Sequence, residues 1–189
     1  MKPIQFLGQF LDNKQVGAVW PSSKFLIYQM VKPIDFKLAK LIIEYGPGTG
    51  NITRVLLNKM RPDAKLIVFE INHNFIEGLK MIDDKRLTIF NCPAEKAKDI
   101  LAEYHFDAPD YVVSSLPLTL IPNSTVTRIL SGTYSLLKTG RPMIQFQYSP
   151  SSLGRFKRMF DKVEVKFAPI NVPPALVYVC SSDLCRPRC

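Results

Sequence analysis

Three glycines at alternating positions follow a short apolar run in the first third of the chain. They are Gly46, Gly48 and Gly50, and Glu44 precedes them in the run LIIEYGPGTG. Glycine permits positive φ and leaves the backbone uncovered, so a ligand can approach it closely. A helix that begins directly after the turn points free N–H groups toward the same space. We therefore interpret the segment as a strand–helix corner of the kind at which open α/β sheets bind nucleotides.

A second acidic residue indicates which kind of nucleotide the corner would bind. The apolar run Leu66–Phe69 is followed by Glu70, which lies 20 residues after Gly50 (70 − 50 = 20). An acidic side chain at this spacing, at the end of the next strand, suits the two hydroxyls of a ribose. The glycine spacing differs from the G-x-G-x-x-G of dinucleotide sites. The alternative, an ordinary corner beside a surface glutamate, requires both spacings to arise by chance.

The elements that would position these residues alternate along the chain. We expect strands over residues 40–44, 65–70, 87–91, 110–114, 143–148, 163–167 and 176–180. We expect helices over residues 51–60, 94–104, 124–137 and 153–160, and one more that Asn72 caps. The helix over 51–60 would turn Ile52, Val55, Leu56 and Met60 inward. Strands that alternate with helices imply an α/β fold with a doubly wound, mostly parallel sheet.

Composition limits the class of protein. The chain has 189 residues, of which 47% are hydrophobic and 22% charged, as in a globular domain rather than a disordered chain. No apolar run approaches the roughly 18 residues that span a bilayer, and the first residues are too polar for a secretory signal, so we expect a cytoplasmic protein. The four cysteines lack the paired spacing of a zinc site, and no metal is expected. The net charge of +9 favours an anionic partner, either nucleic acid or an acidic membrane surface.

The chain divides into three expected parts. Residues 1–34 form a helical segment that serves as a lid or faces a membrane, residues 35–180 form the ligand-binding core, and residues 181–189 form a tail. Within the first part, Leu7 and Leu11 share one helical face. That face either packs on the domain or lies on lipid, because periodicity identifies a face but not what covers it.

Two serines precede a second helical segment. Ser22 and Ser23 follow Pro21, and the helix that they begin would end before Pro33. Together with Lys24, their hydroxyls and the free N–H groups of the helix also make an anion site, for a carboxylate or a phosphate. Capping alone is the alternative, and the spacing favours neither interpretation.

The run E-x-G-P-G-T-G at residues 44–50 resembles the first motif of class I S-adenosylmethionine (SAM) methyltransferases. The segments GAVWPSSKFL (17–26), SSLPL (114–118) and NVPPALVY (171–178) resemble those of bacterial phospholipid N-methyltransferases, which are similar to the ribosomal RNA adenine dimethylases. The resemblance covers residues 17 to 180. It implies a seven-stranded Rossmann-like sheet and SAM as the cofactor.

The resemblance also implies a cofactor site at the ends of the first four strands. The residues expected to bind the cofactor are Glu44, Gly46, Gly48, Gly50, Glu70, Ile71, Cys92, Ala94, Glu95, Ser114, Ser115, Leu116, Ser22 and Ser23. Where the family has an acidic acceptor for the adenine amine, this chain has Pro93, so backbone atoms or Glu95 would replace that contact. The SSLPL corner lacks the aromatic ring on which methyltransferases of base amines stack a flipped base.

The reaction that the resemblance implies is methyl transfer to the amine of phosphatidylethanolamine or a similar lipid head group, at the inner face of the membrane. The amine must lose a proton before it attacks, and Tyr28, Tyr148 and Glu95 are the candidate bases by position. Tyr148 could also face the growing ammonium through a cation–π contact. Each tyrosine is alternatively a plain structural residue. Two other functions stay open, an RNA adenine methyltransferase and a SAM-binding domain that acts on a soluble amine or is not catalytic.

Overall fold

The computed structural model describes residues 24–169 and 174–182. The strands are β1 (Leu41–Tyr45), β2 (Lys65–Phe69), β3 (Leu87–Phe90), β4 (Tyr111–Ser114), β5 (Pro142–Gln147), β6 (Lys162–Ala168) and β7 (Ala175–Ser181). The α-helices are α2 (Lys24–Val31), α3 (Asn51–Lys59), α4 (His73–Lys80), α5 (Ala97–Glu103), α6 (Asn123–Leu136) and α7 (Leu153–Met159). Short 3₁₀ helices, η1 (Ala94–Lys96) and η2 (Pro150–Ser152), precede α5 and α7.

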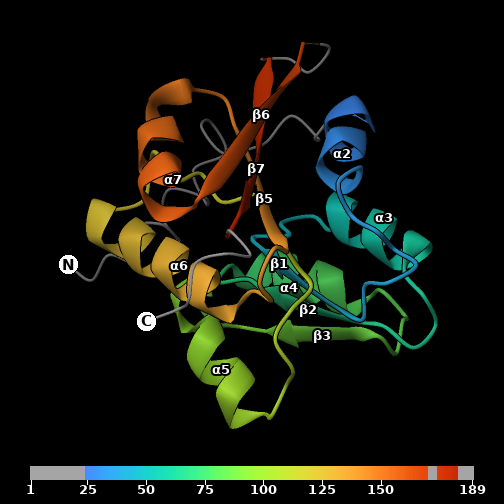
Figure 1. Cartoon of the computed structure of the whole chain (residues 1–189). Helices are drawn as coiled ribbons and strands as arrows, with labels where there is room; N and C mark the ends of the chain where they lie inside the picture. The colour runs from blue at the N-terminus through green and yellow to red at the C-terminus, as the bar shows by residue number, and fades with distance from the viewer. Residues whose placement is uncertain (1–23, 170–173, 183–189) are drawn as a thin grey trace.

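The strands form one seven-stranded sheet in the order β3-β2-β1-β4-β5-β7-β6 (Figure 1). The first five strands in that order run parallel, and β7 runs antiparallel to both β5 and β6. This confirms the predicted mostly parallel sheet. Every position of β1 is buried, as expected for a central parallel strand that helices cover on both faces.

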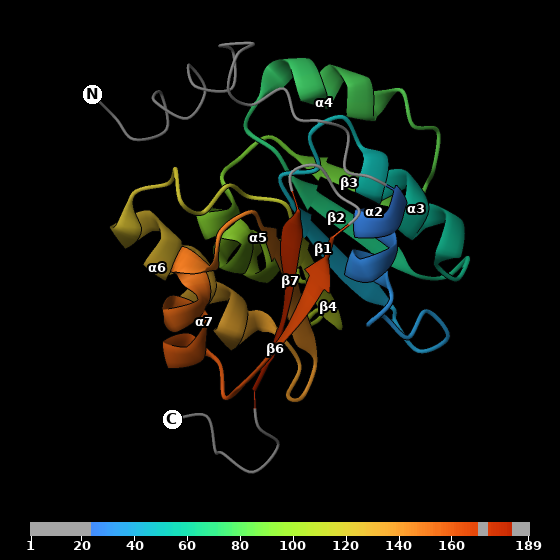
Figure 2. The same ribbon diagram turned by 90° about the horizontal axis from the view of Figure 1, so that it is seen from above.

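Helices cover both faces of the sheet. Figure 2 shows α2, α3 and α4 on one side and α5, α6 and α7 on the other. Because side chains alternate along a strand, each face has its own apolar cluster. Ile42 packs in the cluster beneath α2 and α3, whereas Ile43 packs in the cluster beneath α5 and α6.

Most of the predicted helix boundaries hold, with one correction. The Asn72 side chain accepts a hydrogen bond from the Asn74 amide at 2.9 Å, which confirms the predicted cap of α4. In α3, Ile52, Leu56 and Met60 are buried and Val55 is half-buried against the same cluster, as predicted. Thr53, which we did not expect to face inward, is buried as well. The predicted single helix over 94–104 is instead the 3₁₀ turn η1 followed by α5, because the amide of Lys96 bonds three residues back to Pro93.

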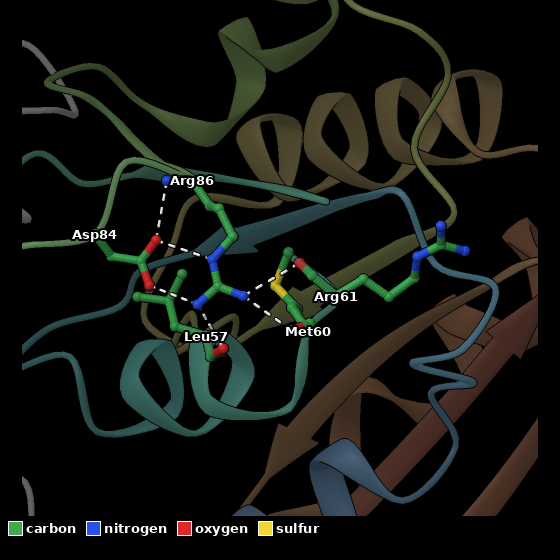
Figure 3. Close-up of polar contacts among 5 residues, drawn as sticks. All are labelled: Leu57, Met60, Arg61, Asp84 and Arg86. Atoms are coloured by element: carbon green, nitrogen blue, oxygen red, sulfur yellow. Dashed lines mark hydrogen bonds and ion pairs between the residues drawn. The ribbon is translucent and has the colours of Figure 1, made fainter. Parts of the chain in front are cut away.

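Arg86 ties the start of β3 to the end of α3 (Figure 3). Its guanidinium donates to the carbonyls of Leu57 and Met60 at 2.8 Å and to that of Arg61 at 3.2 Å. It also pairs with the Asp84 carboxylate at 2.6 Å, and this pairing lowers the pKa of Asp84 to about 2. The last carbonyls of a helix have no partners within it, so Arg86 caps α3 and fixes the distance from α3 to β3.

Candidate active site

The carboxyl ends of four parallel strands meet at one edge of the sheet. Backbone hydrogen bonds continue across these ends, from the Gly46 amide to Phe69, from Glu70 to Phe90 and from Ser115 to Tyr45. The chain leaves β1 toward β2 on one side, and β4 lies on the other side of β1. Such a reversal of strand order is where open α/β sheets bind ligands. The predicted corners therefore lie next to one another.

The glycine turn has the backbone geometry that the sequence suggested. Gly46, Gly48 and Gly50 have φ values of 65°, 54° and 79°, which side chains rarely adopt. A Cβ on Gly48 would meet no atom within 4 Å, whereas one on Gly46 would lie 2.9 Å from the Leu116 Cδ2 atom. The backbone at Gly48 therefore borders open space, while Gly46 packs closely against the β4 corner.

Glu70 is held rigidly at the end of β2. Its side chain is buried, with 5% exposed. One carboxylate oxygen accepts hydrogen bonds from the amides of Ile71 and Asn72 at 2.8 and 2.9 Å, and the other accepts one from Gly48 at 3.1 Å. A carboxylate offers about four acceptor positions, so one remains for a ligand hydroxyl.

Glu44 is fully buried beneath the glycine turn. Its Oε2 atom accepts a hydrogen bond from the Thr53 hydroxyl at 2.7 Å, and its Oε1 atom accepts none from the residues that the structure describes. Burial raises the pKa of Glu44 to about 8. The hydrogen bond from Thr53 lowers this pKa, and the nearby charge of Glu70 raises it further. A buried carboxyl with a spare oxygen fits a cationic group, which would restore its ionised form.

The third corner follows β3. The Asn91 side chain donates to the carbonyl of Glu70 at 3.1 Å, and Cys92 is half-buried with a pKa that burial raises. Ala94 is buried at the start of η1. The carboxylate of Glu95, a candidate for the adenine contact, pairs with Arg128 of α6 at 3.1 Å. This ion pair ties the Glu95 side chain to α6.

The fourth corner follows β4 and includes Ser114, Ser115 and Leu116. Ser114 is buried in the strand, and Ser115 and Leu116 are half-buried beside the glycine turn. The Leu116 carbonyl accepts hydrogen bonds from the side-chain amides of Gln145 and Gln147, at 3.1 and 3.0 Å. The predicted cofactor residues on β1, β2, β3 and β4 thus form one group at the sheet edge.

The comparisons with known proteins agree with this geometry. No protein-family model matches the chain. The ornithine lipid N-methyltransferase of Singulisphaera acidiphila is 29% identical over 179 residues, which are 93% of each chain. The ribosomal RNA small subunit methyltransferase A of Blochmanniella pennsylvanica is 29% identical over 118 residues, 62% of this chain and 41% of that one. The O-methyltransferase TomG of Streptomyces achromogenes, solved in complex with SAM, superposes with a TM-score of 0.68 at 12% identity, over 96% of this chain and 90% of that chain.

The chain is a class I SAM-dependent methyltransferase. Class I methyltransferases use SAM, as in the SAM complex of TomG, and the residues at the sheet edge fit this ligand. The spare Glu44 oxygen suits the cationic amino acid part, the open space at Gly48 leaves room beside the backbone, and Glu70 has an acceptor position for the ribose. The assignment of each contact stays a prediction.

Two other predicted residues of the methyltransferase, Tyr148 and Tyr28, are not part of this group of cofactor residues. Tyr148 follows β5 and is 47% exposed, with its ring against Phe146. Tyr28 lies on α2, is 52% exposed and faces the Lys32 ammonium at 5.8 Å. Ser22 and Ser23 lie outside the described residues, as do Leu7 and Leu11 of the predicted amphipathic face. The structure therefore groups the cofactor residues more closely than the candidate bases.

Sequence analysis missed three buried polar residues of the methyltransferase, Thr53, Gln145 and Gln147. The strand PMIQFQ carries both glutamines on one face among apolar neighbours. A polar side chain in a strand that is covered on both faces indicates a hydrogen-bonding role. That signal identifies such residues but not their partners, which lie 9 positions away for Thr53 and 29 and 31 positions away for the glutamines.

Two other features are absent from residues 24–169 and 174–182. Among these residues, no group of three or more His, Cys, Asp or Glu side chains is arranged to hold a metal ion. Within the same ranges, no helix has both the length and the hydropathy of a bilayer-spanning segment.

Proposed function

We propose that this methyltransferase transfers the methyl group of SAM to the amine of a lipid head group, that of phosphatidylethanolamine or a similar lipid, at the inner face of the membrane. One observation carries the proposal. A relative that is similar over 93% of both chains is named an ornithine lipid N-methyltransferase. That name states both a lipid and methylation at nitrogen.

The proposed roles follow from the geometry at the sheet edge. When bound, SAM would supply a sulfonium methyl carbon that an amine can attack in line, and the demethylated thioether would be the leaving group. Glu44 and the glycine turn would hold its amino acid part, Glu70 its ribose, and the backbone of Cys92 and Ala94 its adenine. The segment 114–118 would then border the acceptor amine. Alignment of the two reactants and exclusion of water are the main contributions that such a site makes to the rate.

The amine must also lose a proton before it attacks. Tyr148 directly follows β5, and its exposed side chain can pass a proton to solvent. Its ring also suits the positive charge of a methylated amine through a cation–π contact. On this proposal Tyr148 acts at the acceptor, and Tyr28 on α2 is the second candidate.

The charge of the chain supports binding at an anionic membrane surface. The net charge is +9, and each well-placed Lys or Arg contributes about 1 kcal/mol to binding of anionic lipid. Binding to vesicles should therefore rise with their content of anionic lipid and fall with added salt. Equal binding to vesicles of neutral lipid would contradict the proposal.

A second candidate acceptor is the adenine of RNA. The similarity to a ribosomal RNA methyltransferase supports it, although the match spans only 41% of that relative's length. The net charge suits RNA as well as it suits lipid. The segment SSLPL offers no aromatic ring for a flipped base, which favours the lipid.

One labelling experiment distinguishes the acceptors. The protein is incubated with SAM labelled at the methyl group and, in separate samples, with vesicles that contain phosphatidylethanolamine, vesicles without an amine lipid, RNA, and ethanolamine. We expect label in the amine lipid only. Gly48→Trp, which fills the open space at the glycine turn, is the inactive control. Label in RNA or in ethanolamine, with none in lipid, would refute the lipid assignment.

A further inference from the structure

The Leu116 carbonyl accepts an unusual number of hydrogen bonds. The amide of Leu118 donates to it at 2.9 Å, which closes a three-residue turn around Pro117. The side-chain amides of Gln145 and Gln147 donate to it at 3.1 and 3.0 Å. A carbonyl oxygen has two lone pairs, so three donors saturate it. The direction of this carbonyl is therefore fixed, and it is not available to an acceptor amine.

Both glutamines are buried, and Gln145 is placed at a cost to the fold. Their side chains are 0% and 4% exposed on β5, the strand that pairs with β4 through Ser114 and Gln145. The Gln145 amide nitrogen also donates to the Phe146 carbonyl at 2.7 Å. The Oε1 atom of Gln145, however, is buried and accepts no hydrogen bond from the described residues. An unmet buried acceptor destabilises a fold. Stability alone would therefore favour an apolar side chain at position 145.

The fixed turn contacts the cofactor corner directly. The Leu116 side chain packs against Gly46, so close that a Cβ there would lie 2.9 Å from its Cδ2 atom. The Ser115 amide meanwhile donates to the Tyr45 carbonyl at 2.9 Å, which joins the segment to the end of β1. Any movement of the segment 114–118 thus changes its distance from the glycine turn.

We propose that Gln145 and Gln147 are positioning residues for methyl transfer. They hold the segment 114–118 against the glycine turn at the spacing that aligns the acceptor amine with the methyl group. This inference rests on the proposed methyl transfer at that corner. It assigns the glutamines a role in the rate of transfer, and no role in binding the cofactor.

The test uses Gln145→Leu, Gln147→Leu and the double variant in the full-length protein. The measurements are kcat and KM with phosphatidylethanolamine vesicles, the Kd for SAM by calorimetry, and the thermal midpoint. We expect Kd within twofold of wild type and a midpoint that is kept or raised. We expect kcat to fall at least tenfold in the double variant, since small misplacements of reactants cost up to about 100-fold in rate. The matched control is Tyr134→Phe, which removes a hydrogen bond to Asp161 on the same face of the sheet and should leave kcat unchanged.

Two outcomes would overturn the inference. One is a folded double variant with kcat within twofold of wild type. The other is a loss of rate that is matched by an equal loss of SAM affinity. If the wild-type protein methylates RNA or ethanolamine instead of lipid, the proposed function fails. The kcat values of wild type and the variants are then compared with that acceptor as the substrate. Hydrogen exchange gives a readout that needs no acceptor: the Leu118 amide should exchange at least tenfold faster in the double variant, and unchanged exchange would contradict the role of the glutamines.

Discussion

Replacing Glu44 by Gln should remove a pH dependence of stability from the protein without SAM. Burial raises the pKa of this carboxyl from 4.5 to about 8, so the folded state binds a proton that the unfolded state has released. Between these two pKa values the free energy of unfolding therefore falls as pH rises. The linkage relation gives a fall of about 2 kcal/mol between pH 6 and pH 8 from this group alone.

The measurement is urea unfolding at several pH values from 6 to 8 for both proteins. Glutamine has the same shape, and its carbonyl oxygen can keep the hydrogen bond from the Thr53 hydroxyl. Both proteins carry the same two histidines, so their titration cancels in the difference between the two curves. The Gln variant should lose the slope and gain stability relative to wild type as pH rises. Parallel curves would refute a buried, protonated Glu44.

Three further predictions concern the cofactor and the fold. Binding of SAM should release a proton from Glu44 near pH 7, because a cationic group restores its ionised form; calorimetry in buffers of different ionisation enthalpy would show it, and equal apparent enthalpies would count against it. Glu70→Ala leaves three amides without their acceptor and removes a proposed ligand contact. The Kd for SAM, measured by calorimetry, should therefore rise at least tenfold, and an unchanged Kd would show that Glu70 is not part of the site. Arg86→Ala uncaps α3 and should lower the free energy of unfolding by about 2 to 4 kcal/mol. Lys80→Ala, at an exposed ion pair, should lower it far less, and equal losses in chemical denaturation would contradict the cap.

The sequence by itself determined the order of the elements, the parallel core and the cofactor corner. These features are local: the apolar run of β1, the glycines that follow it and the acidic residue 20 positions after Gly50 all lie within one strand–helix–strand unit. The period of the apolar residues in such a unit determines which faces are buried, so the pattern can be interpreted without the rest of the chain.

Only the tertiary structure decided which polar side chains meet. Thr53 reaches Glu44, Gln145 and Gln147 reach Leu116, and Arg86 reaches the end of α3 across 26 to 29 residues. These pairs form because strand order and helix packing bring separate segments to within hydrogen-bond distance. A single buried polar residue has no periodicity that identifies its partner, and so the chemistry of the site is only partly visible in the sequence.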